Sequence, residues 1–521
     1  MTVGKLVIPQ EVCDVVGKLQ EAGHKAYVVG GCVRDLLRGA QPKDWDVATS
    51  AKPEEILKLF PESFYENKFL TVTVKTGSED PTLAEVEVTT FRAEGRYTDK
   101  RHPDEVRFAE TLEEDLSRRD FTVNALALNI VEGMAGELID PFGGQKDLKK
   151  KIIRAAGEPE KRFDEDALRM MRAVRLAAEM DFVIEECTAV ALKKQAGNLR
   201  FIAKERVRDE LIKIFLSERP KEGLEFLRDA GLLSFIMPEL EEGVGMEQRW
   251  PHKYDVWEHN LRAIEYAAKE KFSLRVRISA LFHDIGKPRT RVRREGIWTF
   301  YGHDVVGAKM AYGILMRIRF SEKESETIAN LVRRHMFSYK LCRDDQYRND
   351  MRAMGEDPEK KDIEDSEDMQ ETTDSAIRRL IRNVGAEHIG ELIQVRICDR
   401  IATGVPKAVP YRLRHFQFRV EKILREGEAT DVKMLAVRGT DVMEYLGIPS
   451  GPRVGHILNA LLEEVLDEPT KNNRGYLFRQ MSELNALTDE ELKKIRDEAE
   501  EKFEAREEGR VSAIKEKYHV R

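Results

Sequence analysis

Two hydrophobic patterns divide the chain. Between residues 24 and 130, short apolar runs alternate with helical stretches, and the runs read KAYVVGG, WDVAT, FLTVTVK, AEVEVTTF and NALALNI. Apolar runs of this length, bounded by turn residues and separated by helical segments, are typical of strands. The pattern therefore predicts a small mixed sheet with flanking helices.

After the turn-rich segment DPFGGQKDL at residues 140–148, the apolar spacing becomes helical. The segment DEDALRMMRAVRLAAEM contains no helix breaker, and its apolar residues recur at helical spacing: Leu168, Met171, Val174 and Ala178. The rest of the chain reads as almost wholly helical, with a break at PSGP, residues 449–452. The sequence thus predicts an α+β fold in which a small sheet precedes many helices.

Length and composition extend this picture to several domains. At about 150 residues per domain, a chain of 521 residues predicts three or four. No apolar run approaches the ~20 residues that a membrane helix needs, and the start MTVGKLVIPQ has no apolar core of a secretory signal. The five cysteines form no CxxC pair, which favours a reducing cytoplasm and excludes a zinc knuckle.

The net charge of −8 would by itself argue against nucleic-acid binding, but the charge is unevenly distributed along the chain. Residues 355–371 hold nine acids and two lysines, or −7, so the rest of the chain carries about −1. We expect this segment to be a solvated loop, and residues 488–519 to be an exposed or packing helix. Local basic clusters such as RVRR at 291–294 remain able to bind phosphate.

The first candidate site contains two carboxylates two residues apart. Asp44 and Asp46 lie at the start of a predicted strand, where side chains at i and i+2 leave the same face. Two such carboxylates repel one another, and a Mg²⁺ ion relieves that repulsion. Glu87, on the alternating run AEVEVTTF, is a candidate third carboxylate.

A glycine pair precedes these aspartates. Gly30 and Gly31 lack side chains, so the backbone N–H groups there can approach a triphosphate, and Arg34 in the next helical turn adds positive charge. A lone Gly-Gly turn and a lone D-x-D both also arise by chance in an acidic chain. The order of strand, glycine turn, arginine-bearing helix and acidic strands is what favours the site.

The second candidate site is a set of histidines and aspartates in the order H…HD…H…H…D, which resembles the HD phosphohydrolase superfamily: His259, His283, Asp284, His303, His335 and Asp399. Such ligands suit a transition metal such as Mn²⁺, Fe²⁺, Co²⁺ or Ni²⁺. The resemblance implies two metals bridged by Asp284, with Lys287 and Arg289 binding the phosphate of a phosphoester. The alternative for His303 and His335 is that they are ordinary helix residues.

Several motifs of the first 178 residues closely resemble the family of class II tRNA nucleotidyltransferases and bacterial poly(A) polymerases: GGCVRD, KDWDV, EVTTFR, RRDFTVNALAL, DPFGG and DEDALRMMRAVR. A looser resemblance continues through residues 205–239. The family implies a polymerase-β-like head and then helical domains. The expected domains are a nucleotidyltransferase head at 1–150, a helical neck and body at 151–245, an HD domain at 246–405 and a helical tail at 406–521.

The resemblance implies roles for individual residues of the head. Asp44 and Asp46 would hold two Mg²⁺ ions, which assist attack of an RNA 3′-hydroxyl on the α-phosphate of a nucleotide. Arg34 and Arg119 would hold the triphosphate, and Asn124 the ribose. The alternative for Arg119 is a simple ion pair with Asp115 or Asp120.

Three charged residues after the head provide a means of base choice. Asp166, Arg169 and Arg172 are spaced three apart, which predicts one face of a helix. A carboxylate accepts from the amino group of C or A and a guanidinium donates to the ring nitrogen, whereas U and G present an oxygen that the carboxylate repels. Arg172 and Arg175 would aid triphosphate or helix placement. An exposed ion pair is the alternative for Asp166 and Arg169.

The resemblance implies a cytoplasmic enzyme that adds CCA to tRNA 3′ ends from CTP and ATP without a template, and a second, metal-dependent phosphoesterase. For this second activity, the resemblance to the HD superfamily implies a phosphatase or a 2′,3′-cyclic phosphodiesterase. A poly(A) polymerase, or an enzyme adding only CC or only A, shares every motif. A third alternative is an HD phosphohydrolase with an inactive RNA-binding head. The sequence leaves the oligomeric state open.

Overall fold

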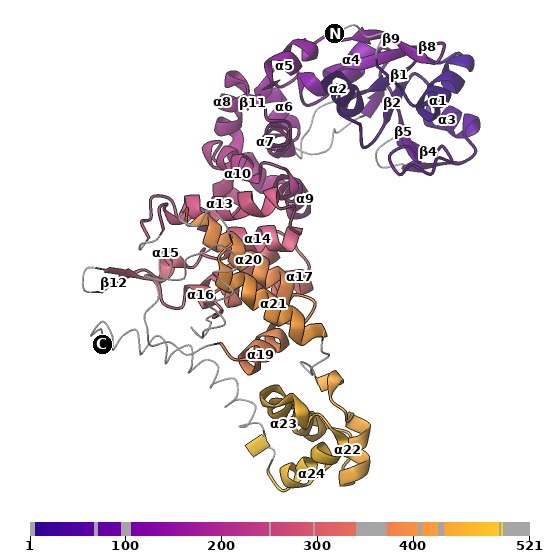
Figure 1. Ribbon diagram of the computed structural model, residues 1–521. Coiled ribbons are helices and arrows are strands. Elements are labelled where there is room, and N and C mark those ends of the chain that lie inside the picture. The colour runs from indigo at the N-terminus through magenta and orange to yellow at the C-terminus, as the bar shows by residue number, and fades with distance from the viewer. Residues whose placement is uncertain are drawn as a thin grey trace. The chain divides into compact units, whose positions relative to one another are not determined.

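The computed structural model describes residues 6–66, 71–94, 106–248, 252–294, 297–339, 372–404, 409–425, 432–488 and 491–492. The chain divides into two compact units (Figure 1). The first unit contains residues 1–241 and 314–321, and the second contains residues 242–313 and 322–521. The division into four domains stays a prediction. The acidic segment 355–371 and nearly all of 488–519 lie outside the described residues.

A seven-stranded mixed sheet forms the head, in the order β3-β4-β5-β2-β1-β8-β9. Its strands are β1 (Ala26–Val29), β2 (Asp46–Thr49), β3 (Ser63–Glu66), β4 (Thr71–Lys75), β5 (Glu85–Thr90), β8 (Ala127–Val131) and β9 (Met134–Ile139). The five predicted runs correspond to β1, β2, β4, β5 and β8, so the predicted sheet is confirmed. Strands β3 and β9 were missed because neither is a distinct apolar run.

The two faces of the sheet follow from alternation along its strands. Val28 and Val47 pack on one face with helices α1 (Gln10–Glu21), α2 (Gly31–Arg38) and α3 (Pro53–Leu59). Val29 and Ala48 lie on the other face with α4 (Leu112–Ser117). Asp46 is two residues before Ala48 on β2 and therefore shares this second face.

Helices follow the sheet in the first unit, as the apolar spacing predicted. They are α5 (Gly144–Lys150), α6 (Pro159–Glu165), α7 (Leu168–Met180), α8 (Glu186–Gln195), α9 (Lys204–Leu216), α10 (Pro220–Asp229), α11 (Leu233–Ile236) and α12 (Pro238–Glu241). Short 3-10 helices lie at η2 (Thr122–Asn124) and η3 (Ala196–Phe201). Short strand pairs join β6 (Arg92–Glu94) to β7 (Val106–Phe108) and β10 (Ile152–Ile153) to β11 (Val183–Ile184).

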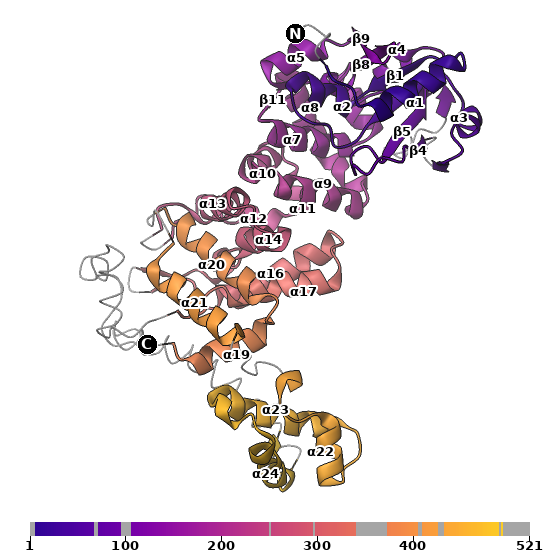
Figure 2. The ribbon, with the colours of Figure 1, turned by 45° about the vertical axis from the view of Figure 1, so that its right-hand side comes forward.

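The second unit is helical apart from one hairpin, β12 (Val292–Arg294) with β13 (Ile297–Thr299), in its described residues. Its helices are α13 (Val256–Lys269), α14 (Leu274–Phe282), α15 (Lys287–Thr290), α16 (His303–Arg317), α17 (Glu322–Arg334), α19 (Asp374–Val384), α20 (Ile389–Ala402), α21 (Tyr411–Arg425), α22 (Gly439–Leu446), α23 (Pro452–Asp467) and α24 (Arg474–Asn485). Figure 2 shows α22, α23 and α24 gathered together, and they share a core of their own. Short turns η4 (Val432–Met434) and η5 (Pro469–Lys471) flank α22 and α23.

The predicted α+β class is confirmed: one small mixed sheet precedes a long series of helices. Among the described helices, none is long and apolar enough to cross a membrane.

Candidate active sites

The glycine turn of the head brings an arginine and an aspartate together. Gly30 follows β1 with a φ of +84°, which favours glycine, and α2 begins at the next residue. A Cβ atom at Gly30 would lie 2.7 Å from Nη1 of Arg119 and 3.2 Å from Oδ2 of Asp46. Gly30 is therefore required both by its backbone angle and by the close approach of these two side chains.

The carboxylates meet across neighbouring strands. Asp46 begins β2 and is the register partner of Glu87 on β5, so both side chains project from the same face. Asp44 precedes β2, so the expectation that both aspartates lie on the strand is wrong. Burial raises the pKa of Asp46 to about 6, with Glu87 and Asp44 adding to the rise and Arg119 opposing it.

This crowding of negative charge fits a divalent cation. Burial and the neighbouring carboxylates Glu87 and Asp44 disfavour the charged form of Asp46, and a bound cation would offset both effects. Within the described residues, groups of three or more potential ligands closer than 4.8 Å occur only in the second unit. Glu87 is thus a neighbour of Asp46 but does not complete a tight triad, and its role as a ligand stays a prediction.

A polar network links the other predicted residues of the head. Arg34 donates to Asn124 over 2.7 Å and also pairs with Asp35. Asn124 donates to Asp120 over 3.0 Å, and Arg172 donates to the other oxygen of Asp120 over 2.7 Å. The network joins α2, η2 and α7. The sequence had indicated Asp120 only as an alternative ion-pair partner of Arg119.

The hydrogen bonds and ion pair of this network stabilise the charged form of Asp120. Burial raises its pKa, but Arg172 and Asn124 outweigh that effect and hold the pKa well below its usual range. Arg119 pairs instead with Asp115, over 3.4 Å, while its Nη1 stays beside Gly30. The ion pair with Asp115 that was the alternative for Arg119 therefore exists, and the same guanidinium also lies beside the glycine turn. Its role in holding the triphosphate stays a prediction.

Asp166 and Arg169 do not lie on one continuous helix. Helix α6 ends at Glu165 and α7 begins at Leu168, so Asp166 lies in the break and accepts a hydrogen bond from the Leu168 N–H. Its carboxylate pairs with Arg206 of α9 over 2.8 Å. The prediction of a single helix face is wrong, because the periodic apolar residues continue across a break that this side chain stabilises.

The remaining arginines of this region have partners of their own. Arg169 is buried and pairs with Glu165, and it donates to the carbonyl oxygen of Arg118 over 3.0 Å. Arg175 pairs with Glu210 of α9 over 2.8 Å. The pair of Arg175 with Glu210 was not predicted, since a partner from a distant helix leaves no signal in local spacing. The pair of Arg169 with Glu165 was also missed, although its i,i+4 spacing could have indicated it.

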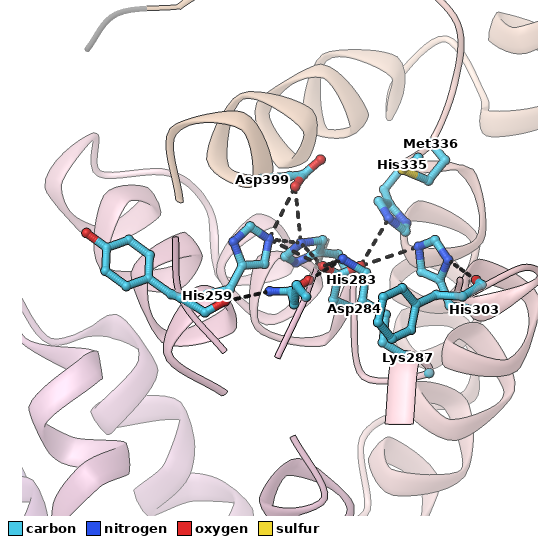
Figure 3. Close-up of polar contacts among 12 residues, drawn as sticks. His259, His283, Asp284, Lys287, His303, His335, Met336 and Asp399 are labelled. Atoms are coloured by element: carbon cyan, nitrogen blue, oxygen red, sulfur yellow. Dashed lines mark hydrogen bonds and ion pairs between the residues drawn. The ribbon is translucent and has the colours of Figure 1, made fainter. Parts of the chain in front are cut away.

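The six predicted metal ligands of the second unit converge on one point (Figure 3). His259, His283, Asp284 and Asp399 offer ligand atoms within 4.8 Å of one another, and all four are buried. The Nε2 atoms of His259 and His283 lie 2.9 Å apart, each 3.3 Å from Oδ2 of Asp284. The ligand atoms of these four residues thus face one small volume.

Asp284 also faces a second group. Its Oδ1 lies 3.4 Å from Nε2 of His303 and 3.8 Å from Nε2 of His335, and these three residues form a second potential metal-binding group. Asp284 is the shared member of both groups, as a bridging ligand would be. His303 and His335 are accordingly oriented toward the cluster.

The histidine rings are oriented for metal binding. The Nδ1 atoms of His283, His303 and His335 each donate to a backbone carbonyl oxygen, at 2.7, 2.8 and 2.6 Å. This arrangement fixes the tautomer in which Nε2 carries a lone pair. The buried Nε2 atoms of His303 and His335 have no hydrogen-bond partner in the described structure. The residues present therefore fit a metal centre.

The charges around the cluster compensate one another. Burial raises the pKa of Asp284, but Lys287, 2.5 Å away, and His283 hold the pKa well below its usual range. Burial likewise opposes a charge on His283, yet the adjacent aspartates raise its pKa to about 10. The two aspartates thus favour a positive charge at this point of the cluster.

Three nearby residues were missed by the sequence analysis. Arg396 lies one helical turn before Asp399 and pairs with its outer oxygen over 2.6 Å, a contact that i,i+3 spacing could have indicated. Gln248 accepts a hydrogen bond from Lys287 over 2.6 Å. His252 packs edge-on against His259, with ring centroids 4.7 Å apart.

Three domain families match the chain, in the order that the geometry suggests. Residues 26–154 match the poly A polymerase head domain. The head of this chain is therefore similar in sequence to poly A polymerase head domains. Residues 181–243 match a probable RNA and SrmB-binding site of polymerase A, and residues 256–403 match the HD domain. The resemblance seen in the motifs is confirmed.

Curated relatives match a little less than half of the chain. The CCA-adding enzyme of Ligilactobacillus salivarius is 47% identical over 237 residues, which are 44% of this chain and 55% of that protein. The CCA-adding enzyme of Geobacillus thermodenitrificans is 40% identical over 252 residues, covering 46% and 59%. The chain therefore spans a little over half the length of the curated relatives that it matches.

Solved structures extend the likeness to most of the chain. A crystal structure of the Bacillus stearothermophilus CCA-adding enzyme in complex with CTP matches with a TM-score of 0.62 and 27% identity, covering 92% of this chain and 97% of that one. The Thermotoga maritima CCA-adding enzyme, complexed with tRNA, has a TM-score of 0.53 at 18% identity over 92% of this chain and 97% of that chain. The second likeness concerns the fold alone.

Proposed function

We propose that the chain is a CCA-adding tRNA nucleotidyltransferase that adds C, C and A to tRNA 3′ ends from CTP and ATP and releases pyrophosphate. The observation that carries the proposal is the meeting of Asp46 and Arg119 at Gly30, beside Glu87, in a poly A polymerase head. The curated relatives that match a little less than half of the chain are CCA-adding enzymes, and one similar enzyme was solved with CTP.

In this proposal the head holds the triphosphate and the attacking hydroxyl group in line. The backbone N–H groups after Gly30, with Arg34 and Arg119, bind phosphate oxygens. Asp44 and Asp46 hold Mg²⁺, which when bound lowers the pKa of the RNA 3′-hydroxyl and stabilises the leaving pyrophosphate. Asn124 orients the ribose, and Arg172 acts through Asp120 to keep Asn124 in place.

Asp166 and Arg169 read the base. Asp166 accepts from the amino group of C or A, and Arg169 donates to the ring nitrogen. In the structure Asp166 pairs with Arg206, and Arg169 pairs with Glu165. A bound nucleotide therefore has to share these two ion pairs or displace them. An oxygen in place of the amino group, as in U and G, would face the Asp166 carboxylate and be repelled. Arg175, fixed by Glu210, positions α7.

The second unit is proposed as a metal-dependent phosphoesterase. The six ligands described above would hold two ions of Mn²⁺, Ni²⁺, Co²⁺ or Fe²⁺, which when bound activate a water molecule against a phosphate ester. Lys287, beside Asp284, is placed to bind a phosphate oxygen. Since the proposed substrates are tRNA, CTP and ATP, we propose that the enzyme works in the cytoplasm.

A direct experiment distinguishes the remaining alternatives. A tRNA transcript that lacks its CCA end is incubated with the full chain, Mg²⁺ and each labelled nucleotide, singly and in combination. The proposal requires two C residues followed by one A, and then a stop. Long A tracts would indicate a poly(A) polymerase, and addition halting after CC, or requiring a CC end, would indicate a partial enzyme. No incorporation would favour an HD phosphohydrolase with an inactive head.

A further inference from the structure

A basic and aromatic surface lies between the two metal-ligand groups along the chain. We call it the arginine–tryptophan stripe, and it consists of Arg291, Arg293, Trp298, Phe300 and Lys287. Arg293 and Trp298 are register partners across the hairpin β12–β13 and therefore share a face. The guanidinium carbon of Arg291 lies 3.7 Å from the centroid of the Trp298 ring, and that of Arg293 lies 5.5 Å away.

These two arginines are not neutralised. In the described part of the chain, neither Arg291 nor Arg293 forms an ion pair with a carboxylate, and the buried Nε of Arg291 has no hydrogen-bond partner. The nearby Arg289 differs, because Glu242 binds it through both carboxylate oxygens at 2.7 and 3.0 Å. The hairpin thus carries unpaired positive charge next to an aromatic ring.

The stripe continues into the metal site. Nζ of Lys287 lies 5.6 Å from the centroid of the Phe300 ring and 2.5 Å from Oδ2 of Asp284. The carbonyl oxygen of Phe300 accepts the hydrogen bond that orients His303. Figure 3 shows Lys287 beside Asp284 and His303. The hairpin strand that bears Trp298 therefore leads directly to a metal ligand.

We propose that the arginine–tryptophan stripe binds a single-stranded nucleic acid and delivers its terminal phosphate to the metal site. Nucleobases stack on aromatic rings and on guanidinium planes, and arginines pair with the phosphates between them. A mononucleotide would place its one phosphate near Lys287 and leave Arg291 and Arg293 unused, so the stripe fits a strand with several phosphates. This inference rests on the proposed phosphoesterase site.

A photocrosslinking experiment tests the surface independently of hydrolysis. Metal-stripped full-length protein is mixed with a 4-thiouridine-containing octanucleotide ending in a 3′-phosphate and irradiated, and the crosslinked peptides are identified by mass spectrometry. We expect crosslinks within residues 291–300. They should be lost in Trp298→Ala with Arg291→Gln and Arg293→Gln, and kept in Trp298→Tyr, which retains an aromatic ring. Crosslinks confined to the first unit would overturn the proposal.

Steady-state kinetics with Mn²⁺ provides the second measurement. Since stacking contributes roughly 1–3 kcal/mol per base, the triple variant should raise KM for the octanucleotide roughly 5- to 150-fold. Hydrolysis of p-nitrophenyl phosphate should not change. The double variant Lys309→Gln and Lys323→Gln removes two exposed positive charges elsewhere in this unit and should leave KM unchanged.

The outcomes separate the two proposals. If the wild type hydrolyses neither substrate, the phosphoesterase proposal fails, while the crosslinks still decide whether the stripe binds a strand. If the wild type hydrolyses both and the triple variant behaves like it, the stripe proposal fails alone. Equal KM values for the octanucleotide and uridine 3′-monophosphate would also overturn it. An otherwise identical deoxythymidine octamer shows whether RNA or DNA is the strand.

Discussion

At Asp46, burial and two neighbouring carboxylates outweigh two arginines, Arg119 and Arg172, and raise the pKa to about 6. The sequence predicted Asp46 as a metal ligand because Asp44 lies only two residues before it. It could not predict that Arg119, 73 positions later, would lie beside Gly30, or that Arg206 would hold Asp166. Both contacts join segments that are far apart in the sequence and that only the fold brings together.

Asp46→Ala removes a proposed Mg²⁺ ligand. Because the reaction depends on electrostatic stabilisation of phosphate oxygens, we expect nucleotide incorporation to fall by about 10³-fold or more. Single-turnover incorporation into tRNA lacking its CCA end measures the loss, and tRNA binding should persist. Glu137→Ala removes an exposed carboxylate from the edge strand β9 and should have no such effect. Normal incorporation in Asp46→Ala would refute the proposed head site.

Asp166→Ala tests how the base is read. The variant loses the acceptor for C and A and also the repulsion toward U and G, so CTP and ATP use should fall while relative UTP and GTP use rises. A good base contact contributes roughly 1–3 kcal/mol, or about 5- to 150-fold. Arg169→Ala should weaken C and A with less gain for U and G, since nothing repulsive is removed. Incorporation with each triphosphate measures the preference.

The ion pair of Asp166 with Arg206 makes a control variant necessary for this experiment. Asp166 also pairs with Arg206, so its loss can loosen α9 as well as the base site. Arg206→Gln breaks that pair while keeping the carboxylate, and it should leave U and G rejected. If Asp166→Ala and Arg206→Gln change stability alike and neither alters nucleotide preference, Asp166 serves only as an ion-pair partner and the base is read elsewhere.

At the scale of elements, local patterns predicted most of what formed. The five apolar runs became strands because alternation sets which face of a strand is buried, and the helical spacing after residue 150 became helices. The break between α6 and α7 escaped prediction because apolar periodicity continues through it. Its causes are a side-chain bond from Asp166 to the Leu168 N–H and a distant arginine, neither of which periodicity records.

The network of Asp120 and Arg172 ties α7 to the head, and Asp120→Asn should weaken it. Fully buried pairs cost about 3–5 kcal/mol to break, but Arg172 is 36% exposed, so we expect a loss of about 2 kcal/mol in the free energy of unfolding. Urea unfolding measures it. Glu158→Gln, which removes an exposed ion pair with Lys161, should change stability by less than about 0.5 kcal/mol.

The same pair predicts a pH dependence with a definite sign. The pKa of Asp120 is lower in the folded protein than its ordinary value of 3.8. Its stabilising contribution is therefore fully present above that value and is lost as the pH falls below it. The difference in unfolding free energy between the wild type and Asp120→Asn should stay constant from pH 7 to about pH 5 and shrink at lower pH. A difference that grew on acidification would contradict the network.

At the scale of the whole molecule, the two candidate sites belong to different compact units and share no residue. The head site is built from β2, β5 and the glycine turn, whereas the histidine cluster is built from the ends of α13, α14, α16, α17 and α20. The order of the motifs along the chain predicted the candidate residues of the head site and of the histidine cluster. The contacts that set their charge, such as that of Arg396 with Asp399, required the structure.

This separation predicts that each activity can be removed alone. His283→Ala with Asp284→Asn removes one ligand and neutralises the shared one, so Mn²⁺-dependent hydrolysis of p-nitrophenyl phosphate should disappear. Addition of CCA should continue at the wild-type rate. Conversely, Asp44→Ala with Asp46→Ala should abolish nucleotide addition and leave hydrolysis intact. Thermal unfolding of each variant controls for misfolding. If either pair of changes abolished both activities in a folded protein, the two sites would act as one, and their assignment to independent units would be wrong.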